Sequence, residues 1–191
     1  MFENSFDILK KNGVTLEKGL SLEELLFIES FYKIKFPRSL ELFLMINVPV
    51  SHGFYNWRNM NKDNVEYINK AINFPYEEIY NNANEVYWND KWGEEPDEDA
   101  YSCIVRKKLK NAPKLVPIYS HRYIPIIPEI NPPVLSIHGV DIIFYGVDLE
   151  NYFDIEFGDK KQNSIQLENL PYIDFWSDII IWLALCTFSP G

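Results

Sequence analysis

The stretch Pro133-Val-Leu-Ser-Ile-His-Gly-Val-Asp-Ile-Ile-Phe-Tyr-Gly-Val-Asp-Leu-Glu-Asn-Tyr-Phe-Asp-Ile-Glu-Phe157 decides the fold of this chain. Two runs rich in strand-forming residues, 134–137 and 140–145, flank the pair His138-Gly139, which suits a hairpin turn. Asp148 then has the place and chemistry of a helix N-cap, and a short amphipathic segment follows it. The stretch therefore predicts a strand, a tight turn, a second strand and a helix in one continuous unit. It carries no set of catalytic residues.

Two helices are expected before this unit, near the start of the chain. Ser21-Leu-Glu-Glu24 has the spacing of a capping box, so we expect a helix from here to about residues 33–36. Pro37 suits the first turn of a second helix, where its missing N–H costs no hydrogen bond. The positions expected to face inward on these helices are Leu22, Leu25, Ile28, Tyr32, Leu40, Phe43 and Leu44.

The middle of the chain also has helical spacing. Residues 63–72 predict a short helix. Pro75 is expected to interrupt the helical structure and to start a new helix. From Tyr76 to Tyr87 the apolar residues recur with a period near 3.6, which is the clearest amphipathic pattern in the sequence. Residues 88–96 are expected to form a loop, and a further helix is expected over residues 97–110.

The remaining elements complete an α+β pattern. Residues 47–53 are expected to form a loop and residues 53–58 a short strand. Residues 115–119 and 123–127 are rich in strand formers but contain prolines, so edge positions or bulges are expected there. A last helix, apolar on nearly every side, is expected over residues 173–187. Because strands and helices alternate irregularly, we expect a mainly antiparallel sheet with helices packed against it.

Length and charge limit the classes of function. The chain has 191 residues, enough for a single domain over residues 1–191, and its net charge is −10. A chain this acidic repels phosphate backbones, so we expect basic protein partners rather than nucleic acid.

The location of the protein is inferred from its two ends and its cysteines. The first residues lack the basic region and apolar run of a signal peptide. The apolar stretch 175–188 is short for a membrane span and contains Asp178, so no membrane association is expected. Cys103 and Cys186 lie in no metal or redox motif and are expected to be free, reduced and partly buried, as in the cytoplasm.

One acidic run with neighbouring tryptophans is the candidate for a functional surface. Acids at the start of the helix at 97–110, and bases near its end, would stabilise the helix dipole, and this alone could explain the run. The alternative is a docking surface for a basic partner, with aromatic residues supplying buried area. Calcium binding is a weaker third interpretation, because the run lacks the EF-hand spacing and central glycine. The candidate partner-binding residues are Trp88, Trp92, Glu94, Glu95, Asp97, Glu98 and Asp99.

Motifs for catalysis or cofactor binding are missing from the sequence. It contains no phosphate-binding glycine loop, no nucleophile elbow, no dinucleotide fingerprint and no HExxH. The histidines His52, His121 and His138 are isolated in sequence, and no pair of cysteines supports a zinc site. We therefore expect no catalytic residues, no cofactor and no metal, and a binding function rather than an enzymatic one.

The order of three segments resembles the SUKH superfamily, which includes bacterial immunity proteins and fungal regulators of cell-wall synthesis. The first segment, 22–44, is similar to the family's opening helix, proline break and second helix. The second is Phe54-Tyr-Asn-Trp57. The third is the 133–157 unit, followed by Phe175-Trp176-Ser-Asp178. One departure is visible at residues 47–53, where family members commonly have Asn-Gly.

The resemblance is strongest over residues 20–180, and it implies an α+β domain with an exposed face for partners. It implies no catalytic residues. The leading hypothesis is a cytoplasmic immunity protein that binds and neutralises a cognate toxin domain, and a nuclease is one candidate for that toxin. A regulatory scaffold or ligand-binding module unrelated to toxins is the alternative, and a small enzyme with an unrecognised site is a third hypothesis.

Overall fold

The computed structural model describes residues 1–180, and the prediction of an α+β fold with antiparallel sheets is confirmed. The α-helices are α1 (Glu3–Lys11), α2 (Leu22–Tyr32), α3 (Arg38–Ile46), α4 (Lys62–Asn81), α5 (Glu98–Leu109) and α6 (Leu149–Glu156). The strands are β1 (Leu16–Lys18), β2 (Asn47–Pro49), β3 (Leu115–Tyr119), β4 (Arg122–Pro125), β5 (Val134–His138) and β6 (Asp141–Gly146). Four short 3-10 helices are η1 (Ala83–Glu85), η2 (Asp90–Trp92), η3 (Gln162–Ser164) and η4 (Leu167–Asn169).

The four-stranded sheet has the order β3-β4-β5-β6, and every neighbouring pair is antiparallel. The hairpin expected in the 133–157 unit is present, with His138 opposite Asp141 and Gly139 in the left-handed region at φ 62°. The turn is thus Gly139-Val140, one residue later than expected, because His138 still belongs to β5. β3 lies at the sheet edge and has an irregularity between Pro117 and Tyr119, as its proline predicts.

The helix caps expected from the sequence form in the structure. Ser21 and Glu24 make the reciprocal capping box at the start of α2. At α6, the Asp148 carboxylate accepts a 2.7 Å hydrogen bond from the backbone N–H of Asn151. These local contacts fix where α2 and α6 begin, because they satisfy N–H groups that a helix start leaves free, and they explain why the helix starts are predictable.

The expected helix break at Pro75 is wrong, because α4 runs unbroken from residue 62 to residue 81. A proline inside a helix lacks the N–H that would bond to the carbonyl four residues earlier, here that of Ala71. The Tyr123 hydroxyl on β4 donates a 3.1 Å hydrogen bond to this carbonyl oxygen. Tertiary contact with the sheet therefore replaces the bond that the proline removes.

The expectation for residues 47–58 is also wrong in part. Residues 47–49 are not loop but β2, which pairs with β1 through Leu16 opposite Pro49 and Glu17 opposite Val48. Residues 53–58 do not form a strand; Phe54 alone makes an isolated bridge, with Tyr119. β2 forms because of long-range pairing, since residues 16–18 form the strand that is hydrogen-bonded to it.

The last helix, expected over residues 173–187, is not present in the described part of that range. Residues 174–180 form turns and bends, with Phe175 in the left-handed region at φ 64°. The Ser177 hydroxyl accepts a hydrogen bond from the backbone N–H of Ile173, which closes a turn. Residues 181–187 of the expected helix lie outside the described residues.

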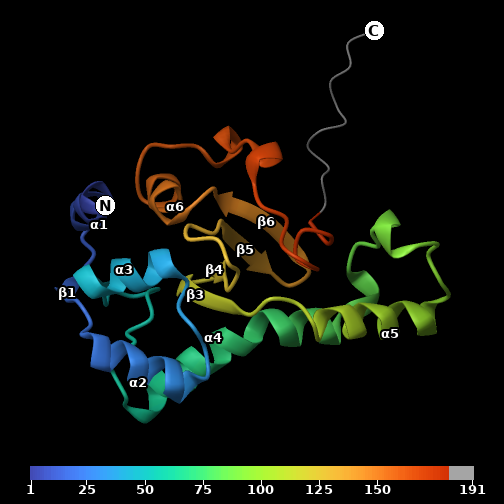
Figure 1. Cartoon of the computed structure of the whole chain (residues 1–191), viewed down its shortest axis with the longest axis horizontal. Coiled ribbons are helices and arrows are strands. Elements are labelled where there is room, and N and C mark those ends of the chain that lie inside the picture. Colours follow the sequence, from blue (N-terminus) through green and yellow to red (C-terminus); the bar gives the residue numbers. More distant parts are fainter. Residues whose placement is uncertain (181–191) are drawn as a thin grey trace, which may run out of the picture.

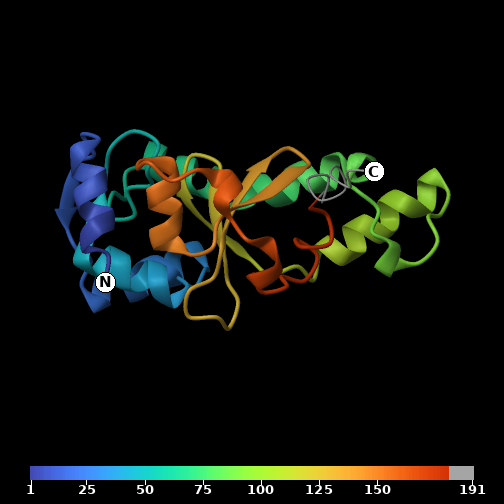
Figure 2. The same cartoon turned by 90° about the horizontal axis from the view of Figure 1, so that it is seen from above.

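The core has two clusters, and the four-stranded sheet contributes residues to both of them. The first joins α1, α2, α3 and α6 to part of the sheet, and the second joins the end of α4, α5, β5, β6 and residues 173–180. Figure 2 shows the result, with α1 to α3 at one end of an elongated molecule and α5 at the other. Among residues 1–180, no helix combines the length and apolarity needed to cross a membrane.

Candidate partner-binding site

The acidic run lies on a projection that we call the acidic arm, residues 88–99. Figure 1 shows it at the far end of α4 and α5, away from the sheet. Its five candidate carboxylates are all exposed; they belong to Glu94, Glu95, Asp97, Glu98 and Asp99. Within residues 1–180, none of the five forms an ion pair. The arm therefore presents unneutralised negative charge to the solvent.

Trp88 lies inside the arm rather than on its surface. Its side chain is 8% exposed and packs edge-on against Trp92, with ring centroids 5.4 Å apart. Its indole N–H donates a 2.9 Å hydrogen bond to the carbonyl oxygen of Gly93. Tyr101 of α5 covers the other side, at 4.9 Å between centroids. Trp88 has little surface left for a partner, and its contacts instead fix the loop.

Trp92 joins the acidic arm to the end of the described chain. Its ring stacks on that of Phe175, and Lys108 lies 4.8 Å from the ring centroid, within cation–π range. Its indole N–H donates a 2.9 Å hydrogen bond to Oδ2 of Asp178. Trp92 is only partly buried, so part of its side chain remains accessible to solvent.

Asp178 is the central acceptor of this junction, and sequence reasoning did not select it. Its Oδ1 accepts a 2.9 Å hydrogen bond from the Tyr172 hydroxyl, and its backbone carbonyl accepts one from the Asn89 side chain. Burial, with the nearby Asp178 carboxylate, raises the pKa of Tyr172 to about 12. The sequence signal that could have identified Asp178 is its position as a lone acid inside an apolar run, because a buried carboxylate requires hydrogen-bond donors.

Asp97 has a structural role as well as an exposed carboxylate. Its Oδ1 accepts a 3.0 Å hydrogen bond from the backbone N–H of Ala100, so it caps α5 as expected for this start. Glu98 and Asp99 occupy the first turn, and basic residues occupy the last. The helix-dipole interpretation therefore accounts for part of the run, while Glu94 and Glu95 precede the cap and are not explained by it.

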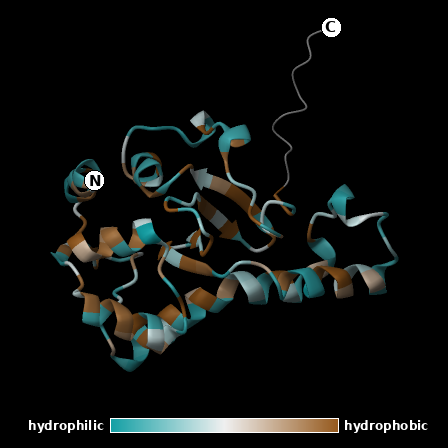
Figure 3. Cartoon of the chain, in the orientation of Figure 1, coloured by the Kyte–Doolittle hydropathy of each residue, from teal (hydrophilic) through white to brown (hydrophobic). Residues whose placement is uncertain are grey.

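A second exposed surface lies on α2, at the opposite end of the molecule (Figure 1). Leu22, Leu26, Phe27 and Phe31 are each about half exposed, at 56%, 51%, 55% and 47%. The expected burial of Leu22 is thus wrong, because the buried positions of α2 are Leu25, Ile28, Glu29 and Tyr32. Figure 3 shows apolar residues along α2 and polar ones over the acidic arm. The two exposed surfaces differ in chemistry as well as in place.

Within residues 1–180 the histidines do not assemble a metal site with other ligands. His121 and His138 lie with ring centroids 6.0 Å apart, and partial burial, with Arg122 and His138 nearby, lowers the pKa of His121. His52 is exposed elsewhere. Over residues 1–180 no three or more His, Cys, Asp or Glu side chains are grouped so as to hold a metal ion. Cys103 is exposed on α5 rather than partly buried, and Cys186 lies outside the described residues.

Comparison with family models, with curated proteins and with solved structures found no match to this chain.

Proposed function

We propose that this chain is a non-enzymatic protein-binding domain that acts as an immunity protein, binding a cognate toxin domain in the cytoplasm and neutralising it. The observation that carries the proposal is the acidic arm, a projecting segment with five exposed carboxylates that form no ion pair within the described residues 1–180. The resemblance to the SUKH superfamily points to the same class. The proposed partner is a basic protein, and neither nucleic acid nor a membrane is part of the proposal.

Charge supplies the physical reason for a nuclease as the toxin. A nuclease must hold phosphates, so its active-site surface is basic. An inhibitor with a net charge of −10 and a concentrated acidic projection is attracted to that surface from a distance. Electrostatic attraction of this kind raises the association rate and orients the encounter.

The rigidity of the acidic arm strengthens the proposal. A loop that is ordered before binding loses less conformational entropy when it binds. The buried Trp88 and the partly buried Trp92 hold this loop through ring packing and hydrogen bonds to Gly93 and Asp178. In the proposed complex Glu94, Glu95, Glu98 and Asp99 contact the partner, Asp97 also caps α5, and the two tryptophans keep the surface in shape.

Co-purification with the protein encoded beside this gene tests the proposal. The chain should capture that neighbour and remove its toxicity when the two are co-expressed. A quadruple variant, Glu94→Gln, Glu95→Gln, Glu98→Gln and Asp99→Asn, should lose both effects while keeping the Asp97 cap. The matched control neutralises four exposed acids elsewhere: Asp7→Asn, Glu129→Gln, Asp159→Asn and Glu168→Gln. A neighbour that is harmless, or toxic but not captured, contradicts the proposal.

A regulatory scaffold is the second candidate, and the apolar face of α2 favours it. Exposed apolar clusters mark protein interaction sites, and this one lies at the other end of the molecule from the acidic arm. A scaffold would join two partners through the two surfaces. Substituting Leu26→Ser with Phe31→Ser would then remove a host partner that binds independently of any toxin, whereas the immunity proposal predicts no lost partner.

A further inference from the structure

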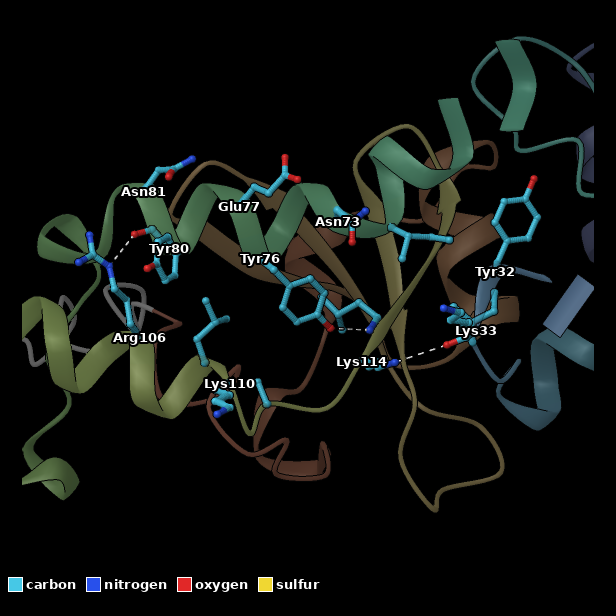
Figure 4. Close-up of a pocket in the computed structure, with 15 residues that line it drawn as sticks. Tyr32, Lys33, Asn73, Tyr76, Glu77, Tyr80, Asn81, Arg106, Lys110 and Lys114 are labelled. Carbon is cyan, nitrogen blue, oxygen red and sulfur yellow. Dashed lines mark hydrogen bonds between the residues drawn. The ribbon is translucent and has the colours of Figure 1, made fainter. Parts of the chain in front are cut away.

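A pocket of about 750 Å³ lies between α4, α5, the end of α2 and the start of β3 (Figure 4). Its size is in the range of sites for small ligands. Apolar and aromatic side chains form most of its wall; they include Ile34, Ile72, Tyr76, Tyr80, Leu109 and Leu115. The pocket belongs neither to the acidic arm nor to the exposed face of α2.

The charges around the pocket are the reverse of those of the whole chain. Among residues 1–180, the basic residues that line it are Lys33, Arg106, Lys110 and Lys114, against one acidic residue, Glu77. The chain as a whole has 28 acidic and only 18 basic residues. A positive rim on a protein of net charge −10 concentrates anions at this one place.

The rim cations are free to bind an anion. In the part of the chain that the structure describes, none of the four forms an ion pair with a carboxylate. Arg106 is held by a 3.0 Å hydrogen bond from its Nε to the carbonyl oxygen of Tyr80, with its guanidinium 4.6 Å from the Tyr80 ring centroid. Lys114 donates a long hydrogen bond, 3.4 Å, to the Lys33 carbonyl oxygen. These cations therefore lie on the edge of an apolar wall.

The wall of the pocket is fixed in place. The Tyr76 hydroxyl donates a 3.2 Å hydrogen bond to the Pro113 carbonyl oxygen and accepts one of 2.9 Å from the Leu115 N–H. Its ring packs edge-on against the buried Trp176, at 5.7 Å between centroids. Burial raises the pKa of Tyr76, so the hydroxyl stays neutral and adds no charge to the wall. The Tyr76 side of the pocket therefore does not have to form around the ligand.

We propose that this pocket binds a long-chain carboxylate, with the apolar tail along the wall and the carboxylate at the basic rim near Lys110 and Lys114. A cationic amphiphile would meet like charge at the rim, and a neutral one would leave the cations unused. Apolar burial supplies the affinity and the cations supply the selection for an anion. This inference does not depend on the immunity proposal, since it uses different residues.

Calorimetric titration with dodecanoate, below its critical micelle concentration, tests the inference. The wild-type chain should bind one dodecanoate and should not bind dodecyltrimethylammonium, which has the same tail and the opposite charge. The double variant Lys110→Glu and Lys114→Glu should weaken the binding by roughly tenfold or more. The control, Lys107→Glu with Lys10→Glu, changes the net charge equally at exposed positions outside the pocket and should leave the affinity unchanged.

A second pair of variants tests the tail site without changing charge. Asn73 lines the pocket and is exposed on α4, so Asn73→Trp should obstruct it without disturbing the core. Asn69, one helical turn earlier, does not line the pocket, and Asn69→Trp should bind as the wild type does. The inference is overturned if dodecanoate does not bind, if the cation binds equally well, or if each variant behaves like its control.

Discussion

The hydroxyl of Tyr123 on β4 donates a 3.1 Å hydrogen bond to the carbonyl oxygen of Ala71 in α4. In a helix without proline this oxygen would accept a hydrogen bond from the N–H of residue 75, but residue 75 is a proline and has no N–H. One buried side chain on the sheet thus satisfies the helix carbonyl that the sequence leaves free. This contact also sets how α4 lies against β4, and α4 carries one wall of the pocket and leads to the acidic arm.

Substituting Tyr123→Phe should lower the free energy of unfolding by about 1–2 kcal/mol, because it leaves the buried Ala71 carbonyl without a donor. The same substitution should cost clearly less in a Pro75→Ala background, where residue 75 regains its N–H and can bond to Ala71. Urea denaturation of the four chains of this cycle measures the difference. Equal costs in the two backgrounds would show that the hydroxyl does not replace the missing helix bond.

Asp178 should be essential for the order of the acidic arm. Asp178→Ala removes the acceptor of both Trp92 and Tyr172, so we expect a loss of about 2–3 kcal/mol in unfolding free energy. Amide hydrogen exchange over residues 89–99 should also accelerate. Asp174→Ala, an exposed carboxylate four residues earlier, is the control and should change neither quantity. Unchanged exchange in Asp178→Ala would mean that Trp92 does not depend on this contact.

The ion pair between Arg58 and Glu24 should make stability depend on acid pH. The hydrogen bond from Arg58, followed by that from the Ser21 backbone N–H, lowers the pKa of Glu24 from 4.5 to about 2. A lowered folded-state pKa stabilises the protein above pH 4.5, and this stabilisation is lost as the pH falls from 4.5 toward 2. Arg58→Ala should therefore be least stable, relative to the wild type, above pH 4.5.

Denaturation curves at several acid pH values measure this dependence. The stability difference between wild type and Arg58→Ala should shrink as the pH falls, because the wild type loses the contribution of ionised Glu24. Glu24→Gln, which cannot ionise, should show a much flatter pH dependence over the same interval. A stability difference that stays constant with pH would show that Arg58 does not lower the pKa of Glu24.

Substitutions of Asp97 and of the acidic residues before it should differ in their effect on the stability of the protein. Asp97→Ala removes the N-cap of α5 and should cost about 1 kcal/mol, and Asp97→Asn should restore most of it. Glu94→Gln and Glu95→Gln precede the cap and should stay within about 0.5 kcal/mol of the wild type. Thermal unfolding measures all four variants. A large loss in the two glutamine variants would give these carboxylates a structural role.

The elements that depend on local chemistry were predictable from the sequence. The capping box at Ser21, the Asp148 cap and the hairpin after Val134 involve residues within a few positions of one another. β1 and β2 were not predictable, because strands of three residues have little periodicity and pair across about thirty positions. The predicted break of α4 at Pro75 is wrong because the hydrogen-bond donor that replaces the missing N–H of Pro75 is the hydroxyl of Tyr123, on another element.

The candidate site was predictable in its charge but not in its architecture. Exposed acids follow from composition and from their place before a helix. The inward position of Trp88 does not follow from these features. The contact of Trp92 with Asp178 does not follow from them either, because the two residues lie 86 positions apart. Tryptophans beside acids were expected to be partner contacts, and their hydrogen bonds to Gly93 and Asp178 are visible only in three dimensions.

The affinity of the chain for the protein encoded beside its gene, measured by calorimetry at increasing salt, tests the central claim most directly. The account predicts tight binding that weakens steadily with salt, and a much weaker, less salt-dependent interaction for the variant with Glu94, Glu95, Glu98 and Asp99 neutralised. Binding that is absent, or equal in this variant and in the wild type at every salt concentration, would contradict it.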